Sequence, residues 1–158
     1  MPVIAFIALG SNLGDRRANI MKAIELLKSA GKVEIMKVSS LHETEPEGGP
    51  PQGKFLDGAA EIRTELSPHE LLAHLKQVEQ ETGRRPSGVR WGPREIDLDI
   101  LLYGDLTVND PDLTIPHPLL HLRAFMAGPL AEIAPGAFHP VIRKTASGIF
   151  EGLSGKKI

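Results

Sequence analysis

The apolar positions of this chain predict alternating strands and helices. Residues 3–9, with the sequence VIAFIAL, are continuously apolar, as in a strand that is buried on both faces. After a glycine-containing turn, Ile20, Ile24 and Leu27 recur at helical spacing, and Gly31 follows as a candidate C-cap. The start of the chain therefore predicts a central strand followed by an amphipathic helix.

The same kinds of pattern continue through the middle of the chain. Residues 33–44 and 55–65 have the pattern of strands, and the loop between them is rich in glycine and proline. Ser67 is a candidate N-cap with proline at the next position, and the helix that it begins is predicted to stop at Gly83. Residues 96–103 form the fourth predicted strand.

Two weaker features follow the fourth strand. Residues 106–108 have the pattern of a short edge strand, and a final helical region is expected after Pro118, up to about Ile133. The predicted order is β-α-β-β-α-β with a helical C-terminal extension, which is the ferredoxin-like arrangement of the α+β class. We expect one domain over residues 1–158, with helices on one face of an antiparallel sheet and the other face open for ligands.

Composition narrows the range of functions. The formal net charge of −2 gives no reason to expect bulk attraction to nucleic acid or to a membrane. The absence of cysteine excludes disulfides, thiolate metal ligands and cysteine nucleophiles. The first residues lack the pattern of a signal peptide, and no apolar run approaches the ~20 residues that span a bilayer. We therefore expect a cytoplasmic protein without a nucleic-acid or membrane partner.

An arginine cluster stands directly before the fourth predicted strand. Four of the nine arginines are Arg84, Arg85, Arg90 and Arg94. Guanidinium groups bind phosphate in a bidentate manner and keep their charge at any working pH, so the cluster suits a polyphosphate ligand. The alternative is a solubilising surface loop.

Two aspartates follow within the fourth predicted strand. Asp97 and Asp99 alternate with apolar residues, so both carboxylates should lie on one face, about 6.5–7 Å apart along the strand. Such a pair can hold two Mg²⁺ ions ~3.5–4 Å apart, as metal-assisted chemistry on a nucleotide polyphosphate requires. The alternative is a solvated face with two charges, which the poor strand propensity of aspartate and like-charge repulsion disfavour.

Four other residues are candidates that the sequence leaves open. His117 and Arg123 lie beyond the aspartate strand and could donate to phosphate oxygens, or could be structural. Phe55 and Phe125 are two of the five phenylalanines, and they either pack in the core or stack on a planar heterocycle. The glycine-containing turn at residues 10–14 has neither the dinucleotide-binding nor the P-loop fingerprint, and tight packing is its expected role.

Residues 90–100, RWGPREIDLDI, closely resemble the signature of the 6-hydroxymethyl-7,8-dihydropterin pyrophosphokinase family of folate biosynthesis. Stretches at residues 8–14, 39–44 and 115–125 resemble the same family in the same order. The resemblance covers about residues 3–135. It implies a ferredoxin-like fold and transfer of pyrophosphate from ATP to the pterin hydroxymethyl group, leaving AMP.

The resemblance also implies roles for particular residues. Two Mg²⁺ ions would bind Asp97 and Asp99. The catalytic group would be Arg84, Arg94, Asp97 and Asp99. The phosphates of ATP would contact Arg84, Arg94, His117 and Arg123, with Glu79 and Trp91 also near the nucleotide. The pterin would lie between Phe55 and Phe125, hydrogen-bonded by residues around Thr44, Glu45, Glu47 and Asp57.

The chain departs from the family pattern at four positions. Asp57 stands where asparagine is frequent, and an ionised carboxylate could pair with the pterin N3–H and 2-amino donors but could not donate. Pro86 replaces a second loop arginine, for which Arg85 or Arg90 could substitute. Asp112 stands where some members carry an arginine, and Phe55 replaces a tyrosine.

Two other functions fit part of this sequence. A metal-dependent nucleotide hydrolase could use the same aspartates and arginines, but it would need no pterin site. A non-catalytic ferredoxin-like module that binds RNA would need an aromatic and basic sheet face. Two outward aspartates on the fourth strand argue against that module.

Overall fold

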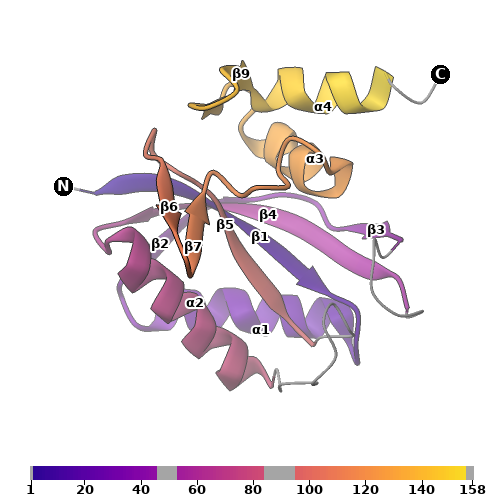
Figure 1. Cartoon of the computed structure of the whole chain (residues 1–158). Helices are drawn as coiled ribbons and strands as arrows, with labels where there is room; N and C mark the ends of the chain where they lie inside the picture. The colour runs from indigo at the N-terminus through magenta and orange to yellow at the C-terminus, as the bar shows by residue number, and fades with distance from the viewer. Residues whose placement is uncertain (1, 46–52, 84–94, 156–158) are drawn as a thin grey trace.

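The computed structural model of the chain describes residues 2–45, 53–83 and 95–155. Its elements in chain order are β1 (Val3–Ser11), α1 (Arg16–Ser29), β2 (Val33–Val38), β3 (His42–Thr44), β4 (Phe55–Thr64), α2 (Pro68–Thr82), β5 (Asp97–Tyr103), β6 (Val108–Asp110), β7 (Leu113–Ile115), α3 (Ala124–Ile133), β8 (Phe138–His139), β9 (Lys144–Thr145) and α4 (Ala146–Gly155). Figure 1 shows a central sheet with α1 and α2 on one side and α3 and α4 on the other.

The main sheet is antiparallel throughout. Its strand order is β2-β4-β1-β5, with β3 also paired to β4. The apolar run at residues 3–9 forms most of β1, which lies between β4 and β5 with helices over both faces. The predicted α+β class with an antiparallel sheet is confirmed.

Local signals explain where the first helix begins and what it buries. Asp15 precedes α1, and its side chain accepts a hydrogen bond of 3.1 Å from the backbone N–H of Ala18. Ile20, Ile24 and Leu27 are buried against the sheet, as their spacing predicted. The cap sets the start of α1, and the apolar stripe packs the helix against the sheet face that is the lower one in Figure 1.

The second helix begins with a capping box. The backbone N–H of Glu70 donates to Ser67 Oγ at 3.2 Å, and the backbone N–H of Ser67 donates to Glu70 Oε1 at 2.8 Å. The helix ends at Gly83, whose φ of 118° lies in the left-handed region that glycine adopts without strain. Both predicted ends of α2 are confirmed.

The second face of the sheet is not open along its length, contrary to the prediction. A second core cluster joins Phe6, Ala59 and Leu101 of the sheet to helical residues that include Leu130 of α3 and Ile149 of α4. Apolar residues of the C-terminal extension therefore cover part of this face. Among the described residues, no helix combines the length and apolarity needed to cross a bilayer.

Three segments differ from the sequence prediction. The predicted strand at residues 33–44 is interrupted between Val38 and His42, where Ser39 Oγ accepts a hydrogen bond of 2.9 Å from the N–H of Ala59 in place of a backbone carbonyl. The short strand expected at 106–108 lies two residues later, in a hairpin of β6 and β7. The tail, in which the sequence showed little pattern, forms β8, β9 and α4.

Candidate active site

Three neighbouring strands bring two carboxylates to one row of the sheet. Gly10 of β1 pairs with Asp57 of β4 on one side and with Asp97 of β5 on the other. Residues paired in this way project from the same face, so both carboxylates lie on the face that α3 partly covers. Two inter-strand spacings, roughly 10 Å, separate their backbones.

Gly10 leaves space for the Asp57 side chain. A Cβ atom on residue 10 would lie 3.0 Å from Asp57 Oδ1 and 3.8 Å from Cδ1 of Phe55. Any larger residue would therefore crowd the carboxylate, and the role of Gly10 lies in the site rather than in the turn that follows. The sequence alone gave no signal for this role, because it depends on strand pairing.

The two aspartates of β5 lie on one face of the strand, as predicted. Asp97 and Asp99 are half-buried, while Leu98 and Ile100 are each only 4% exposed on the opposite face. Asp99 pairs with Ala8 of β1, whose small side chain leaves room beside the carboxylate. Oxygen ligands on one face are the ligands that Mg²⁺ prefers, so the residues fit such an ion.

Glu79 of α2 fixes the backbone between these aspartates. Its side chain is 4% exposed, and Oε2 accepts a hydrogen bond of 2.8 Å from the N–H of Leu98. The bond supplies a partner for a buried donor on β5, which lies at the end of the strand order. Glu79 thus holds the backbone between Asp97 and Asp99 from the side of the sheet that α2 covers.

His117 lies where it can act as a hydrogen-bond donor. Its backbone N–H donates to Leu101 at 3.0 Å, and its Nδ1 accepts from the N–H of Leu119 at 3.1 Å. Burial lowers the pKa of His117, Asp97 acts in the opposite direction, and Arg123 lowers the pKa further. The neutral ring therefore carries its proton on Nε2, which remains a donor at neutral pH.

Asp57 has a raised pKa. Burial raises the pKa of its carboxyl to about 6, and the charge of Asp97 adds to the rise. The Thr44 hydroxyl, which donates a hydrogen bond to Asp57 Oδ2, and the nearby His42 act in the opposite direction. Asp57 therefore changes charge close to physiological pH, within electrostatic reach of Asp97.

A cavity of about 480 Å³ opens next to Asp57. His42, Thr44 and Asp57 line it from the sheet, Phe125 from α3 and Phe150 from α4. This volume falls in the ~300–1,000 Å³ range of ligand sites, and an apolar wall with a few convergent polar groups is typical of them. The arrangement suits a planar polar heterocycle.

Comparison with known proteins identifies the family. The sequence profile described as 7,8-dihydro-6-hydroxymethylpterin-pyrophosphokinase (HPPK) matches residues 6–135. The chain belongs to this family. An Aquifex aeolicus member, named 2-amino-4-hydroxy-6-hydroxymethyldihydropteridine pyrophosphokinase, is 46% identical over 88% of this chain and 85% of its own length. A Bacillus subtilis member of the same name is 48% identical over 82% of this chain and 77% of its own length.

Solved structures of HPPK proteins share the fold. The wild-type HPPK-DHPS of Plasmodium falciparum, solved with SDX-DHP, matches 99% of this chain with a TM-score of 0.78. The match covers 45% of that longer chain at 15% identity, so it establishes the fold alone. The family resemblance read from the sequence is confirmed, as is the predicted class of enzyme, an ATP-dependent pyrophosphokinase.

The structure brings most of the described HPPK candidates together. Asp97 and Arg123 both lie close enough to His117 for their charges to affect its pKa. The guanidinium carbon of Arg123 lies 5.8 Å from the ring centre of Phe125. Phe125 lines the cavity, whereas Phe55 is half-buried beside Gly10 and pairs with Thr44. The side chain of Glu45 points to the surface, where Lys54 Nζ lies 3.6 Å from its Oε1.

The remaining HPPK candidates lie outside the described residues. These are Glu47, Arg84, Trp91 and Arg94, together with Arg85, Pro86 and Arg90. The residues that flank the arginine segment are close together, since a Cβ atom on Gly83 would lie 2.6 Å from Glu95 Oε2. Both flanks thus lie at the corner where β5 begins, beside the aspartate pair.

A polar cluster at the edge of the cavity was missed by the sequence analysis. Ser40 donates from its backbone N–H to Glu132 Oε2 and from its hydroxyl to Glu132 Oε1, each at 2.7 Å. His42 Nε2 lies 2.9 Å from the same hydroxyl. The cluster ties the connection between β2 and β3 to α3, so it holds the two sides of the cavity together.

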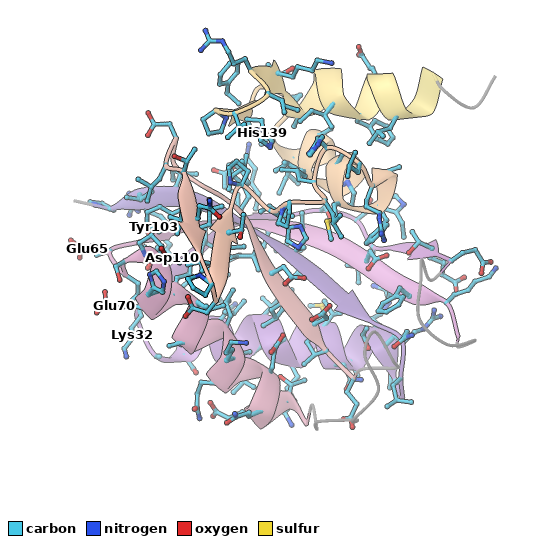
Figure 2. The ribbon with its side chains drawn as sticks, in the orientation of Figure 1. Lys32, Glu65, Glu70, Tyr103, Asp110 and His139 are labelled. Carbon is cyan, nitrogen blue, oxygen red and sulfur yellow. The ribbon has the colours of Figure 1, made fainter. Side chains whose placement is uncertain are left out.

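A second group of polar residues lies away from this corner. His69 Nε2 of α2 is 3.2 Å from Asp110 Oδ2 and 3.4 Å from Asp112 Oδ1. Figure 2 shows Asp110 on the β6–β7 hairpin, at the end of the sheet where Tyr103 also lies. The departure at Asp112 is therefore part of a polar group that joins the hairpin to α2.

Proposed function

We propose that this chain transfers pyrophosphate from ATP to the hydroxymethyl group of 6-hydroxymethyl-7,8-dihydropterin and releases AMP, a step of folate biosynthesis. The observation that carries the proposal is the row formed by Asp57, Gly10 and Asp97 on three neighbouring strands. In this row Asp57 can accept hydrogen bonds from a heterocycle, and Asp97 can hold a metal ion that binds phosphate. An enzyme that joins two substrates needs both sites on one face.

We assign the chain to the ferredoxin-like fold. The strand order β2-β4-β1-β5, with α1 and α2 in two of its connections, supports the assignment. Two core clusters that share one sheet support a single domain over residues 1–158. The cytoplasmic location stays a prediction, which cell fractionation would test.

The pterin is proposed to lie between Phe55 and Phe125, with Asp57 at its hydrogen-bonding edge. An ionised Asp57 would accept from the ring N3–H and the 2-amino group, and a charged acceptor makes stronger hydrogen bonds than a neutral one. The hydrogen bond from the Thr44 hydroxyl supports this role, because it fixes the orientation of the carboxylate. The further contacts would come from Thr44, Glu45 and Glu47.

The aspartate pair is proposed to hold two Mg²⁺ ions. When bound, these ions would neutralise the polyphosphate and polarise the reacting phosphorus. Asp97 and Asp99 would fix the ions in place, and Glu79 would fix both aspartates through the backbone of Leu98. The residues proposed to hold ATP around them are Arg84, Arg94, His117 and Arg123, with Glu79 and Trp91 near the nucleotide.

In the proposed reaction the protein contributes position and charge. The hydroxymethyl oxygen bonds to the β-phosphorus of ATP, the bond from that phosphorus to the bridging oxygen breaks, AMP leaves with that oxygen, and the hydroxyl proton passes to solvent. His117 is proposed to donate from Nε2–H to a phosphate oxygen. Its neutral ring supports this contact, because Nε2–H can donate without losing its proton. No side chain needs to act as a general base.

The test is the stoichiometry of the products. The purified chain, incubated with ATP, Mg²⁺ and 6-hydroxymethyl-7,8-dihydropterin, should form AMP and the pterin pyrophosphate in equal amounts, measured by chromatography. ATP should remain intact when the pterin is left out. Turnover of ATP without an acceptor would instead indicate the nucleotide hydrolase.

A further inference from the structure

The cavity beside Asp57 extends to the C-terminal helix. Its sheet side is polar, with Thr44 and Asp57, whereas its helical side consists largely of apolar residues of α3 and of Phe150 from α4. The family profile ends at residue 135, so α4 lies outside the matched region. A residue of the unmatched tail therefore helps to form the site that the family shares.

Gly128 allows the Phe150 ring to reach the cavity. A Cβ atom on residue 128 would lie 3.1 Å from Cε1, 3.5 Å from Cδ1 and 3.6 Å from Cζ of Phe150. Figure 1 shows α4 lying across α3 on the side away from the sheet, and Phe150 of α4 is nevertheless among the residues that line the cavity. Glycine is unfavourable inside a helix, and this close approach of the ring gives a physical reason for it here.

Phe150 and Phe125 contribute to the same wall. Gly128 lies three residues after Phe125, so the two positions are neighbours on one face of α3. Phe150, whose ring packs on Gly128, lines the same cavity as Phe125, and the residue is 36% exposed. An aromatic ring that lines a cavity and stays partly exposed has apolar area that a planar ligand can still cover.

We propose that Phe150 of α4 is a pterin-positioning residue, which closes the outer end of the cavity next to Phe125. The inference rests on the proposed function, because it takes the pterin as the occupant of this cavity. Phe150 shields the bound ring from water and restricts its orientation, whereas the polar contacts of Thr44 and Asp57 select it. It takes no part in the chemical step or in the binding of ATP.

The test compares variants of the full chain by calorimetry. Pterin affinity is measured with a non-hydrolysable ATP analogue and Mg²⁺ at saturation, and the affinity for the analogue is measured separately. Phe150→Ala should weaken pterin binding about two- to tenfold, the range expected for one lost aromatic contact. The affinity for the analogue and kcat should stay unchanged, while KM for the pterin rises.

Phe138→Ala is the matched control. Phe138 lies on β8, in the same tail, and is 47% exposed, but it does not line the cavity. A second variant, Gly128→Ala, keeps the ring and adds one methyl group that displaces it. This change removes no aromatic area, but Gly128 itself lines the cavity, so weaker pterin binding in Gly128→Ala supports the role of the ring only when Phe150→Ala also binds pterin more weakly.

The outcomes separate this inference from the proposed function. Pterin affinities of Phe150→Ala and Phe138→Ala that agree within experimental error would overturn the role of Phe150, even if the wild-type chain makes AMP. A wild-type chain that binds pterin in a Phe150-dependent way but forms no AMP would overturn the proposed function alone. A wild-type chain that binds no pterin would overturn both.

Discussion

Asp57 and Asp97 lie on opposite sides of Gly10, each in register with that glycine across β1. No side chain of residue 10 separates the two carboxylates, and the charge of Asp97 raises the pKa of Asp57. The proposed pterin site and the proposed metal site are therefore coupled through protonation. The first two predictions follow from this coupling.

Asp57 should make the stability of the free chain depend on pH. Its pKa is about 6 in the folded chain against an ordinary 3.8, so the folded state binds this proton more tightly. The resulting stability is present in full below the lower value and is lost as the pH rises through the higher one. At about pH 8, Asp57→Asn should therefore be more stable than wild type, by on the order of 2–3 kcal/mol.

Urea unfolding across the acid to alkaline range would measure this effect. The difference between Asp57→Asn and wild type should shrink as the pH falls towards the unfolded value. Asp105→Asn, which makes the same substitution at an exposed position just after β5, serves as the control. A constant offset between Asp57→Asn and wild type at every pH would contradict the prediction.

Asp57 should also set the pH dependence of pterin binding. The ionised carboxylate accepts from two ring donors, and protonation near pH 6 removes the charge, so wild-type affinity should fall as the medium becomes acidic. Asp57→Asn should bind more weakly at neutral pH and respond less to pH. Asp57→Ala should bind more weakly still. Equal affinities of the three proteins at neutral pH, measured by calorimetry, would show that Asp57 does not contact the ring.

The aspartate pair should govern the metal-dependent step. Asp97→Asn and Asp99→Asn each keep the shape of the side chain but remove charge, so Mg²⁺-dependent turnover should fall by orders of magnitude. Circular dichroism should show an unchanged fold, because both side chains are only half-buried. Turnover close to that of wild type in both variants would remove the metal assignment.

Glu79 should act on the aspartates through the backbone. Glu79→Ala leaves the buried N–H of Leu98 without this acceptor and should cost about 1–3 kcal/mol in the free energy of unfolding. The Mg²⁺ concentration needed for half-maximal turnover should rise as well, because the strand that carries Asp97 is less fixed. Glu79→Gln retains an acceptor and should recover most of both effects. Glu81→Ala, on the exposed side of α2, is the control.

The arginine segment should act in the chemical step. Arg94→Ala and Arg84→Ala should each lower the single-turnover rate, because their contacts with the polyphosphate strengthen as charge develops. Arg63→Ala removes an exposed arginine whose partner is Glu34 on β2, and should leave that rate unchanged. Either loop variant with a normal single-turnover rate and a lower melting temperature would be reassigned to a structural role.

Features with a local cause could be predicted from the sequence. Ser67 and Glu70 form a cap within one turn, and Asp97 and Asp99 alternate with buried neighbours along one strand. The family motif lies in the same region and gave the enzyme class. Each of these signals is complete within a few residues, so no knowledge of strand order was needed.

Features that depend on distant contacts could not be predicted. Gly10 gains its role only when β1 lies between β4 and β5, and Ser40 meets Glu132 across 92 positions of the chain. Gly128 within an apolar helix reads as a weak helix former until Phe150 is seen to pack on it. The closed part of the second sheet face was missed for the same reason, because the tail has little periodic pattern of its own.

The central place of β1 bears on how this enzyme can move. β1 pairs with β4 over its whole length and with β5 over most of it, so Asp57 and Asp97 are held on a single hydrogen-bonded scaffold. Rearrangement of a connecting segment can alter access to the site. The spacing of Asp57 and Asp97 along the sheet is kept as long as the backbone hydrogen bonds of the sheet are intact. Access to the site can thus change while the sheet keeps the spacing of these two aspartates.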